Sequence, residues 1–278
     1  MSEGAKVKGV KIHPTAIIDP KANLGVNVEI GPFCIVESEV KLGDNVYLGE
    51  RCTIHSGSQI GNNCHLNGGV IIGMQPQDLK YKGEKTLVII GENTQIREMA
   101  SIERGTVTGN GYTTVGKDTL IMAFAHIAHD CQVGNNVILS HGAGLAGHVI
   151  VEDRVVIGGM SGIHQFCRIG TMAMIGGVSK VTKNVPPYLL VDGAPAKVAG
   201  VNFVGLRRGG LTPEVRAEIK KAYKLLYRKN NNVSQAISEI EQTLKGYPEI
   251  DHFVRFLREV GRGICSARKE EEGEDNED

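Results

Sequence analysis

An aliphatic residue recurs at every sixth position along most of this chain. The series runs without interruption from Ile12 to Ile72, returns from Ile90 to Ile102, and continues from Val115 to Val181, which makes 26 six-residue units. A period of six fits neither a 3.6-residue helix nor a two-residue strand alternation, but it suits a short strand followed by a corner. With three units to a coil, the sequence predicts a mainly β protein, a parallel β-helix of triangular cross-section with about nine coils, each about 4.8 Å high.

Composition and charge agree with this fold and exclude several classes of protein. Glycine makes up 36 of the 278 residues, about twice the usual share, and glycine or asparagine, turn residues that tolerate positive φ, often follows the aliphatic position. The net charge of zero argues against attraction of the whole chain to nucleic acid or to an anionic membrane. No apolar run reaches 18 residues, the six cysteines lack C-x-x-C spacing, and no signal-peptide pattern opens the chain. We therefore predict a cytoplasmic protein with no transmembrane segment and no nucleic-acid partner.

The extent of the repeat predicts the first domain. Residues 1–200 should form the prism, and the period is interrupted at 73–88 and 105–114. Loops that interrupt a rigid repeat are favoured places for function. We therefore expect these two loops to contribute to a site.

Beyond the repeat, residues 201–265 are expected to form a helical domain, in which Thr212 caps a helix that begins at Pro213. Between positions 201 and 269 the chain has 14 Lys or Arg and 7 Asp or Glu, a balance that suits an acidic protein partner. Residues 266–278 are mostly acidic and are expected to form a disordered tail.

Histidines are the strongest candidates for chemistry in the prism. Five lie in the second half of the repeat, and a sixth, His65, lies earlier. In the phase of the repeat, Asp130 stacks beneath His148, so part of the group shares one region of the surface. A neutral imidazole is the usual general base for activating a hydroxyl near pH 7. The five are His126, His129, His141, His148 and His164.

Two competing interpretations are weaker. Zinc-dependent carbonic anhydrases built on hexapeptide prisms pair histidines separated by four residues, whereas His126 and His129 are separated by two, so we predict no metal. Positions 142–147 match the dinucleotide fingerprint G-x-G-x-x-G. That motif needs a strand-to-helix turn, and here the six-residue period continues through it.

Four segments of the chain are distinctive: QDLKY at 77–81, HIAHDC at 126–131, LAGH at 145–148 and HQF at 164–166. They resemble a known family, the UDP-N-acetylglucosamine O-acyltransferases of lipid A synthesis, and the likeness extends over about residues 10–262. The resemblance implies a left-handed prism, a homotrimer with active sites between subunits, an acyl carrier protein thioester as donor, UDP-N-acetylglucosamine as acceptor, and no cofactor.

The resemblance also assigns roles to residues of this chain. It makes His129 the general base, Asp130 its support, and the backbone N–H of Gly147 the oxyanion donor. It places Asn202 and Arg208 near the nucleotide, and arginine suits phosphate. The residues that it implies along the sugar and pantetheine parts of the cleft are Gln77, Asp78, Lys80, His126, His148, His164 and Gln165.

The resemblance implies that acyl length is set by Met174 and Gly177, where glycine leaves a groove open for a long 3-hydroxyacyl chain. Two positions depart from the family pattern. Val204 stands where an acidic residue is common, and Gly209 where a basic residue is common, which leaves the uridine and phosphate contacts open.

Three alternative functions stay open at this stage. The acceptor could carry an amine in place of the 3-hydroxyl, or the chain could be the later N-acyltransferase of the pathway, although that enzyme has a further domain ahead of its prism. A catalytically silent hexapeptide scaffold is the third, and the His129-Asp130 pair together with the loop at 77–81 argues against it.

Overall fold

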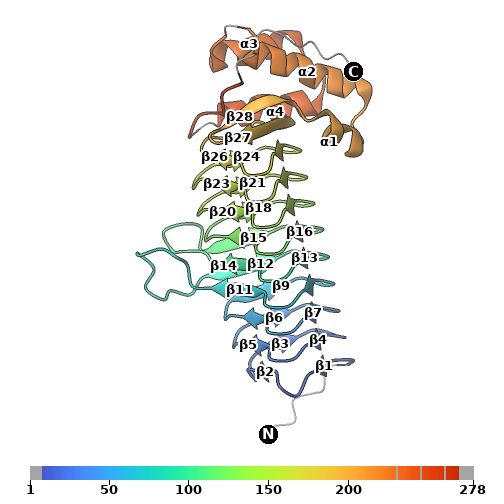
Figure 1. Cartoon of the computed structure of the whole chain (residues 1–278), viewed down its shortest axis with the longest axis vertical. Helices are drawn as coiled ribbons and strands as arrows, with labels where there is room; N and C mark the ends of the chain where they lie inside the picture. Colours follow the sequence, from blue (N-terminus) through green and yellow to red (C-terminus); the bar gives the residue numbers. More distant parts are fainter. Residues whose placement is uncertain (1–7, 230, 245, 260, 269–278) are drawn as a thin grey trace.

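The computed structural model describes residues 8–229, 231–244, 246–259 and 261–268. The chain forms a tall prism of stacked coils, and a group of helices covers its C-terminal end (Figure 1). In the described residues, strands β1 to β26 form three parallel sheets, one along each side of the prism, and successive strands pass from one sheet to the next; β27 and β28 then extend one of these sheets. The coils form a left-handed β-helix, which confirms the predicted fold class.

We name the three sheets face A, face B and face C. Face A contains β1 (Lys11–Ile12), β4 (Glu29–Ile30), β7 (Tyr47–Leu48), β10 (His65–Leu66), β13 (Gln95–Ile96), β16 (Leu120–Ile121), β19 (Ile138–Leu139), β22 (Val156–Ile157), β25 (Met174–Ile175), β27 (Leu189–Gly193) and β28 (Ala196–Val201). Face B contains β2 (Ile17–Ile18), β5 (Ile35–Val36), β8 (Thr53–Ile54), β11 (Ile71–Met74), β14 (Ser101–Glu103), β17 (His126–Ile127), β20 (Gly144–Leu145), β23 (Gly162–Ile163) and β26 (Lys180–Val181). Face C contains β3 (Asn23–Leu24), β6 (Lys41–Leu42), β9 (Ser58–Ile60), β12 (Leu87–Ile90), β15 (Tyr112–Val115), β18 (Gln132–Val133), β21 (Ile150–Val151) and β24 (Arg168–Ile169).

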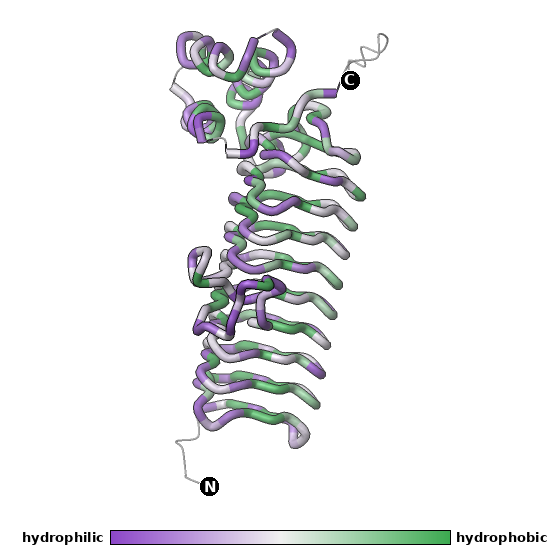
Figure 2. The backbone as a smooth tube through the Cα atoms, turned by 90° about the vertical axis from the view of Figure 1, so that its left-hand side faces the viewer, coloured by the Kyte–Doolittle hydropathy of each residue, from purple (hydrophilic) through white to green (hydrophobic). Residues whose placement is uncertain are grey.

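The aliphatic residues of the six-residue series form the core of the prism. Each lies in one of the strands β1 to β26, and from Ile30 to Val181 every member of the series is buried. Apolar segments recur at matching places in successive coils (Figure 2). Full burial of each side chain contributes about 1.5–3 kcal/mol relative to exposure. In the first coil Ile12 remains 44% exposed.

The corner between faces C and A, the CA corner, carries a ladder of asparagines. Asn27, Asn45, Asn63 and Asn93 have φ of 57–58°, a left-handed conformation that asparagine tolerates better than most residues. Each side-chain amide donates to the next rung, over 3.1, 2.9 and 3.1 Å, and Asn93 donates to Asp118 over 3.0 Å. An ionised carboxylate has no proton to pass on, so Asp118 ends the ladder.

The corner between faces A and B, the AB corner, has the same backbone but apolar side chains. Five of its residues have positive φ and are 56–74% exposed. We call them the apolar edge: Phe33, Met99, Phe124, Met160 and Val178. Exposed apolar groups aligned in this way mark an interaction surface.

The corner between faces B and C, the BC corner, carries both interruptions of the repeat. One leaves the prism between β11 and β12, at 75–86, and the other between β14 and β15, at 104–111. Both loops are shorter than the expected 73–88 and 105–114, although the second begins one residue earlier than expected. The reason is that strands β11, β12 and β15 extend into the expected loop ranges and keep their parallel pairing there.

After β26 the described part of the chain forms an antiparallel hairpin, β27 and β28, and then four helices. Thr212 accepts a hydrogen bond from the backbone N–H of Val215, which confirms it as the cap of the helix that begins at Pro213. A short helix precedes that one and was not expected. The helices are α1 (Phe203–Arg208), α2 (Pro213–Tyr227), α3 (Val233–Thr243) and α4 (Pro248–Arg258).

A polar cluster joins the helices to the prism. Glu152 accepts from His252 Nε2 over 2.7 Å and from Arg168 Nη2 over 2.6 Å. The Arg168 guanidinium also lies 4.8 Å from the ring centre of Phe256 in α4. Burial by itself raises the pKa of Glu152, but hydrogen bonds from His252 and Thr171 outweigh it and lower the pKa to about 2.

One expectation about the C-terminus needs correction. Residues 266–268 pair with β28, because Val198 N donates to Ser266 O and Arg268 N donates to Val198 O, each over 2.9 Å. The rest of the predicted acidic tail, 269–278, lies outside the described residues. Among the helices described, none is both long and apolar enough to span a bilayer.

Candidate active site

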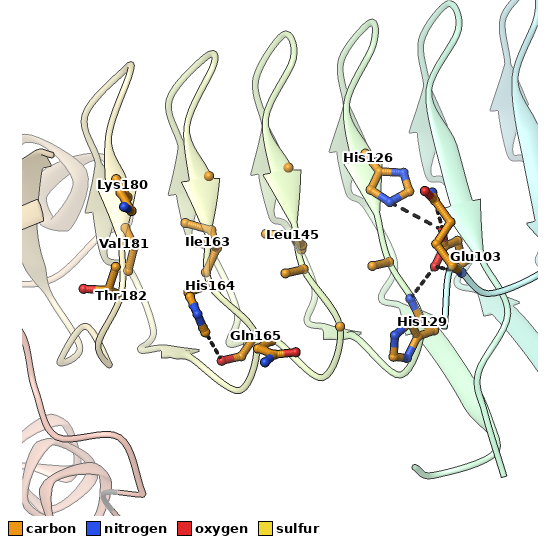
Figure 3. Close-up of a pocket in the computed structure, with 16 residues that line it drawn as sticks. Glu103, His126, His129, Leu145, Ile163, His164, Gln165, Lys180, Val181 and Thr182 are labelled. Atoms are coloured by element: carbon orange, nitrogen blue, oxygen red, sulfur yellow. Dashed lines mark hydrogen bonds and ion pairs between the residues drawn. The ribbon is translucent and has the colours of Figure 1, made fainter. Parts of the chain in front are cut away.

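A cleft of about 570 Å³ lies along face B. Its floor is made by the outward positions of four successive strands, which hold His126, Gly144, Gly162 and Lys180 in stacked register. A Cβ atom at Gly144 or Gly162 would meet nothing within 4 Å. Two missing side chains therefore leave a groove between the histidine and the lysine (Figure 3).

At the BC corner His129 forms a hydrogen-bonded pair with Asp130. Its Nδ1 lies 2.8 Å from Asp130 Oδ2, and the carboxylate is fully buried. Because a carboxylate accepts, this bond places the proton on Nδ1 and leaves Nε2 as the basic nitrogen. The pair therefore has the geometry of a general base with an orienting acid.

The loop 104–111 holds the Asp130 carboxylate in place. Thr106 donates through its backbone N–H over 3.0 Å and through its hydroxyl over 2.7 Å, and Asn110 N–H donates over 3.1 Å. Burial alone raises the pKa of Asp130, but the hydrogen bonds from Thr106 and His129 outweigh it and lower the pKa. Asp130 is thus kept ionised beside the imidazole.

Gly147 lies against the His129 ring. A Cβ atom at this position would come within 2.7 Å of both Cε1 and Nε2 of His129. Any side chain there would displace the imidazole, so the ring position requires glycine. The peptide of Gly147 is consequently beside the basic nitrogen.

His148 contacts both members of this pair, with Nε2 3.9 Å from Asp130 Oδ2. Its ring stacks on Phe166 with centroids 4.6 Å apart and meets His129 edge-on at 5.1 Å. Burial lowers the pKa of His148, which favours the neutral ring.

His129, Asp130 and His148 are the one group in the described chain with three potential metal-ligand atoms within 4.8 Å of one another. A cation would have to compete with the Thr106 and Asn110 hydrogen bonds that already occupy both Asp130 oxygens. The arrangement therefore suits a hydrogen-bonded base better than a metal site, and the absence of a metal stays a prediction.

Several other predicted residues line the cleft. His126 lies one coil below Gly144, with Nδ1 2.9 Å from the Ser101 hydroxyl. Gln77 also contributes to the wall. So do His164 and Gln165, which Figure 3 labels. Asp78 and Lys80 lie in the loop 75–86 beside Gln77, outside the lining of the cleft, and Asp78 Oδ1 accepts from Lys80 N over 3.0 Å.

Two of the candidate histidines lie elsewhere. His65 belongs to face A, where it stacks on Tyr47 at 4.3 Å, and His141 lies at the AB corner against Phe124 at 5.4 Å. The six-residue period places His141 two units away from His129, hence on another corner, and this is why the expected grouping was too wide.

The nucleotide and acyl-length candidates are also outside the cleft of this chain. Asn202 caps α1, accepting from Gly205 N over 3.1 Å and donating to Met172 O over 2.9 Å, and Arg208 ends that helix. Met174 lies in β25 on face A, and Gly177 follows in the turn of the AB corner.

Sequence reasoning missed Glu103. This fully buried carboxylate lines the cleft and contacts Gln77, His126 and His129. A signal was present, because glycine or asparagine often follows the aliphatic position, whereas a glutamate follows Ile102 directly before the second loop.

The six-residue prism, the helical cap and a hydrogen-bonded histidine-carboxylate pair beside a surface cleft are typical of a hexapeptide-repeat transferase. Models of hexapeptide repeats match residues 39–73 and 112–147, and the model described as UDP-N-acetylglucosamine O-acyltransferase, domain 2, matches residues 184–265. The acyl-[acyl-carrier-protein]–UDP-N-acetylglucosamine O-acyltransferase of Aliivibrio fischeri strain MJ11 is 48% identical over 254 residues, 91% of this chain and 97% of that protein. This chain belongs to the UDP-N-acetylglucosamine O-acyltransferase family.

Solved structures agree with this assignment. LpxA of Acinetobacter baumannii is 42% identical and superposes with a TM-score of 0.89, over 91% of this chain and 99% of that one. The UDP-N-acetylglucosamine acyltransferase of Francisella novicida is 38% identical with a TM-score of 0.91, over 93% and 95% of the two chains.

Proposed function

We propose that this protein transfers a 3-hydroxyacyl chain from acyl carrier protein to the 3-hydroxyl of UDP-N-acetylglucosamine, the first step of lipid A biosynthesis. The observation that carries the proposal is the His129 imidazole, fixed through Nδ1 on a buried, ionised Asp130 in a member of this family. The reaction needs no cofactor, because the thioester itself supplies the activated acyl group. A cytoplasmic location completes the proposal.

In this mechanism His129 Nε2 takes the proton of the sugar hydroxyl while the oxygen attacks the thioester carbonyl. The Gly147 N–H stabilises the oxyanion as it forms. When the C–S bond breaks, the imidazolium returns the proton to the departing thiolate, so the new ester and a free thiol result. Asp130 stabilises the imidazolium between the two steps.

The other residues are proposed to bind the substrates. The wall of the cleft, with Gln77, His126, His164 and Gln165, supports contacts to sugar and pantetheine, and the groove over Gly144 suits a narrow chain. His148, which contacts the base, and Asp78 and Lys80 of the loop 75–86 are assigned to the sugar side.

A homotrimer explains the residues that lie outside the cleft. The apolar edge borders face B, so a second copy packed on it would adjoin the cleft, and burying exposed Phe and Met side chains would stabilise the contact. We propose that Asn202 and Arg208 serve a neighbouring subunit's nucleotide. Met174 and Gly177, beside the same corner, are proposed to set acyl length in the groove between subunits.

The central experiment incubates purified protein with UDP-N-acetylglucosamine and a series of 3-hydroxyacyl carrier-protein thioesters and identifies products by mass. We expect an ester of the intact sugar nucleotide, formed fastest with a long acyl chain, and a shift toward shorter chains in Gly177→Met. A parallel reaction with the 3-amino analogue tests the alternative acceptor. Absence of any acylated sugar nucleotide would overturn the proposal, and unchanged length preference in Gly177→Met would remove the role of Gly177.

A further inference from the structure

Glu103 ends strand β14 at the BC corner, directly before the loop 104–111. Its side chain is fully buried, which is costly for a carboxylate unless donors surround it. Figure 3 shows it beside His126 and His129, at the end of the cleft away from Lys180. Gln77 of the loop 75–86 hydrogen-bonds to it there.

The carboxylate connects three segments of the site. Oε1 accepts from Gln77 Nε2 over 2.7 Å, and Oε2 accepts from the backbone N–H of Gln77 over 3.3 Å and of His129 over 3.1 Å. His126 Nε2 lies 3.7 Å from Oε1. The loop, the strand β17 and the turn that carries the base are thereby tied to one group.

The same contact occurs at two other places in the prism. Glu37 accepts from Ser56 N over 2.9 Å, and Glu152 accepts from Thr171 N over 2.8 Å. Each glutamate directly follows an inward aliphatic residue, which is Val36 for Glu37 and Val151 for Glu152. In the next coil, Ile54 stacks on Val36 and Ile169 stacks on Val151, and the donor lies two positions after the stacked isoleucine. We call this contact a coil clamp.

Glu103 meets the same definition, because Ile102 stacks on Ile127 and the clamped residue is His129. The inserted loop lengthens the sequence separation without changing the geometry. Of these three clamps, the one at Glu103 holds the residue proposed as the base.

We propose that Glu103 is a positioning residue of the active site, which fixes the main chain of His129 and docks Gln77 of the loop 75–86 onto it. The inference rests on the proposed function. Glu103 acts indirectly, because it contacts the main chain of His129 and the side chain of Gln77. Such positioning matters for the rate, since misplacing a base by about 1 Å can lower the rate about 10²-fold.

Three variants separate the contributions. In Glu103→Gln the amide oxygen can still accept from both backbone N–H groups, and its NH2 can donate to Gln77 once that amide turns over, so the geometry survives without the charge. Glu103→Ala loses every contact. Glu37→Ala is the matched control, since it removes a coil clamp from the same corner far from the base.

The test measures kcat, KM for the sugar nucleotide, and the rate at which trypsin cuts the loop 75–86, which exposes Lys80, Lys82 and Lys85. We expect Glu103→Ala to lower kcat about 10²-fold, to raise KM for the sugar nucleotide, and to hasten cleavage in the loop. Glu103→Gln should restore most of kcat, KM and loop protection, and Glu37→Ala should leave all three at wild-type values.

An active wild type with Glu103→Ala at equal kcat and equal loop protection would overturn the inference, whereas an inactive wild type would instead refute the proposed function. If Glu103→Ala does not fold, Glu103→Asp replaces it, because aspartate keeps the charge but cannot reach both Gln77 and His129. A lower kcat in Glu103→Asp than in Glu103→Gln supports the positioning role. A lower kcat in Glu103→Gln, or wild-type kcat in both variants, contradicts it.

Discussion

The BC and CA corners use the same left-handed turn for different purposes. At the CA corner, asparagines with φ near 57° repeat from coil to coil and hydrogen-bond one another. At the BC corner the equivalent positions hold Asp130, His148 and Phe166, with φ of 59–64°, and both interruptions of the repeat leave the prism there. The repeat supplies the same rigid left-handed turn at each corner. The candidate site forms where the side chain at that turn is no longer the repeated asparagine and where an inserted loop adjoins it.

This comparison predicts that substitutions at the two corners affect different properties, turnover at one corner and stability at the other. A change at the BC corner close to His129 should alter turnover with little effect on stability, because the side chains there surround the cleft. A change at the CA corner should do the opposite, because its side chains only link coils.

The largest expected effect is that of His129→Ala. Loss of a general base costs about 10²–10⁴-fold in kcat, while removal of a half-buried imidazole from the cleft wall leaves the core intact. We expect a wild-type melting temperature with that loss of turnover, measured by thermal unfolding and product mass. Asn63→Ala at the CA corner is the control and should retain full activity. Comparable turnover in both variants would contradict the division between the corners.

The third corner provides the next largest effect. Each apolar side chain buried between subunits should contribute about 1.5–3 kcal/mol, and a trimer would repeat the contact. If the proposed trimer of three 29.9 kDa chains forms, Met160→Asp should dissociate it, as measured by light scattering, and activity should fall with the mass. The polar substitution Asn63→Asp at the CA corner should leave the mass unchanged. A fully active wild-type monomer would exclude a shared site.

Much of the fold followed from local information. Each aliphatic of the six-residue series lies in a strand, because a six-residue unit contains both its strand and its corner. Thr212 and Pro213 carry their own capping signal in the same way. The short helix α1 escaped prediction because its cap, Asn202, depends on contacts to Met172 in the prism.

The site was only partly predictable for a related reason. His129 and Asp130 are neighbours in sequence, so their pairing was visible, and the family likeness supplied the role. Glu103 reaches His129 across a coil and an inserted loop, and no sequence period connects them. Separating His141 from the cleft required counting which face each unit occupies.

The CA corner changes character at Glu152, where the helical domain docks. The pKa of this carboxyl is lowered to about 2 from an ordinary value of 4.5, so its contribution to stability is complete above pH 4.5 and is lost as the pH falls toward 2. The difference corresponds to about 3 kcal/mol. Glu152→Gln should lower the free energy of unfolding by roughly that amount at pH 7 and should approach wild type by pH 2.

Denaturant unfolding at several pH values tests this expectation. The control is Glu259→Gln, which removes the more exposed partner of the same Arg168 and should have a much smaller effect. An equal loss from both variants at pH 7, or a loss from Glu152→Gln that does not depend on pH, would exclude Glu152 as the acid-sensitive link.

The smallest expected effect concerns the asparagine ladder itself, and Asn45 occupies its second rung. Asn45→Gly keeps the left-handed turn but loses hydrogen bonds to Asn27 and Asn63, which should cost about 1 kcal/mol. Asn45→Ala loses the same bonds and must also adopt φ of 57° with a Cβ, which adds about 1 kcal/mol. The denaturant midpoints of the two variants therefore separate the contribution of the hydrogen bonds between asparagines from that of the left-handed backbone conformation. Turnover should be unchanged in both variants. A Gly variant as stable as wild type would mean that the turn conformation, and not the hydrogen bonding between rungs, selects asparagine at this corner.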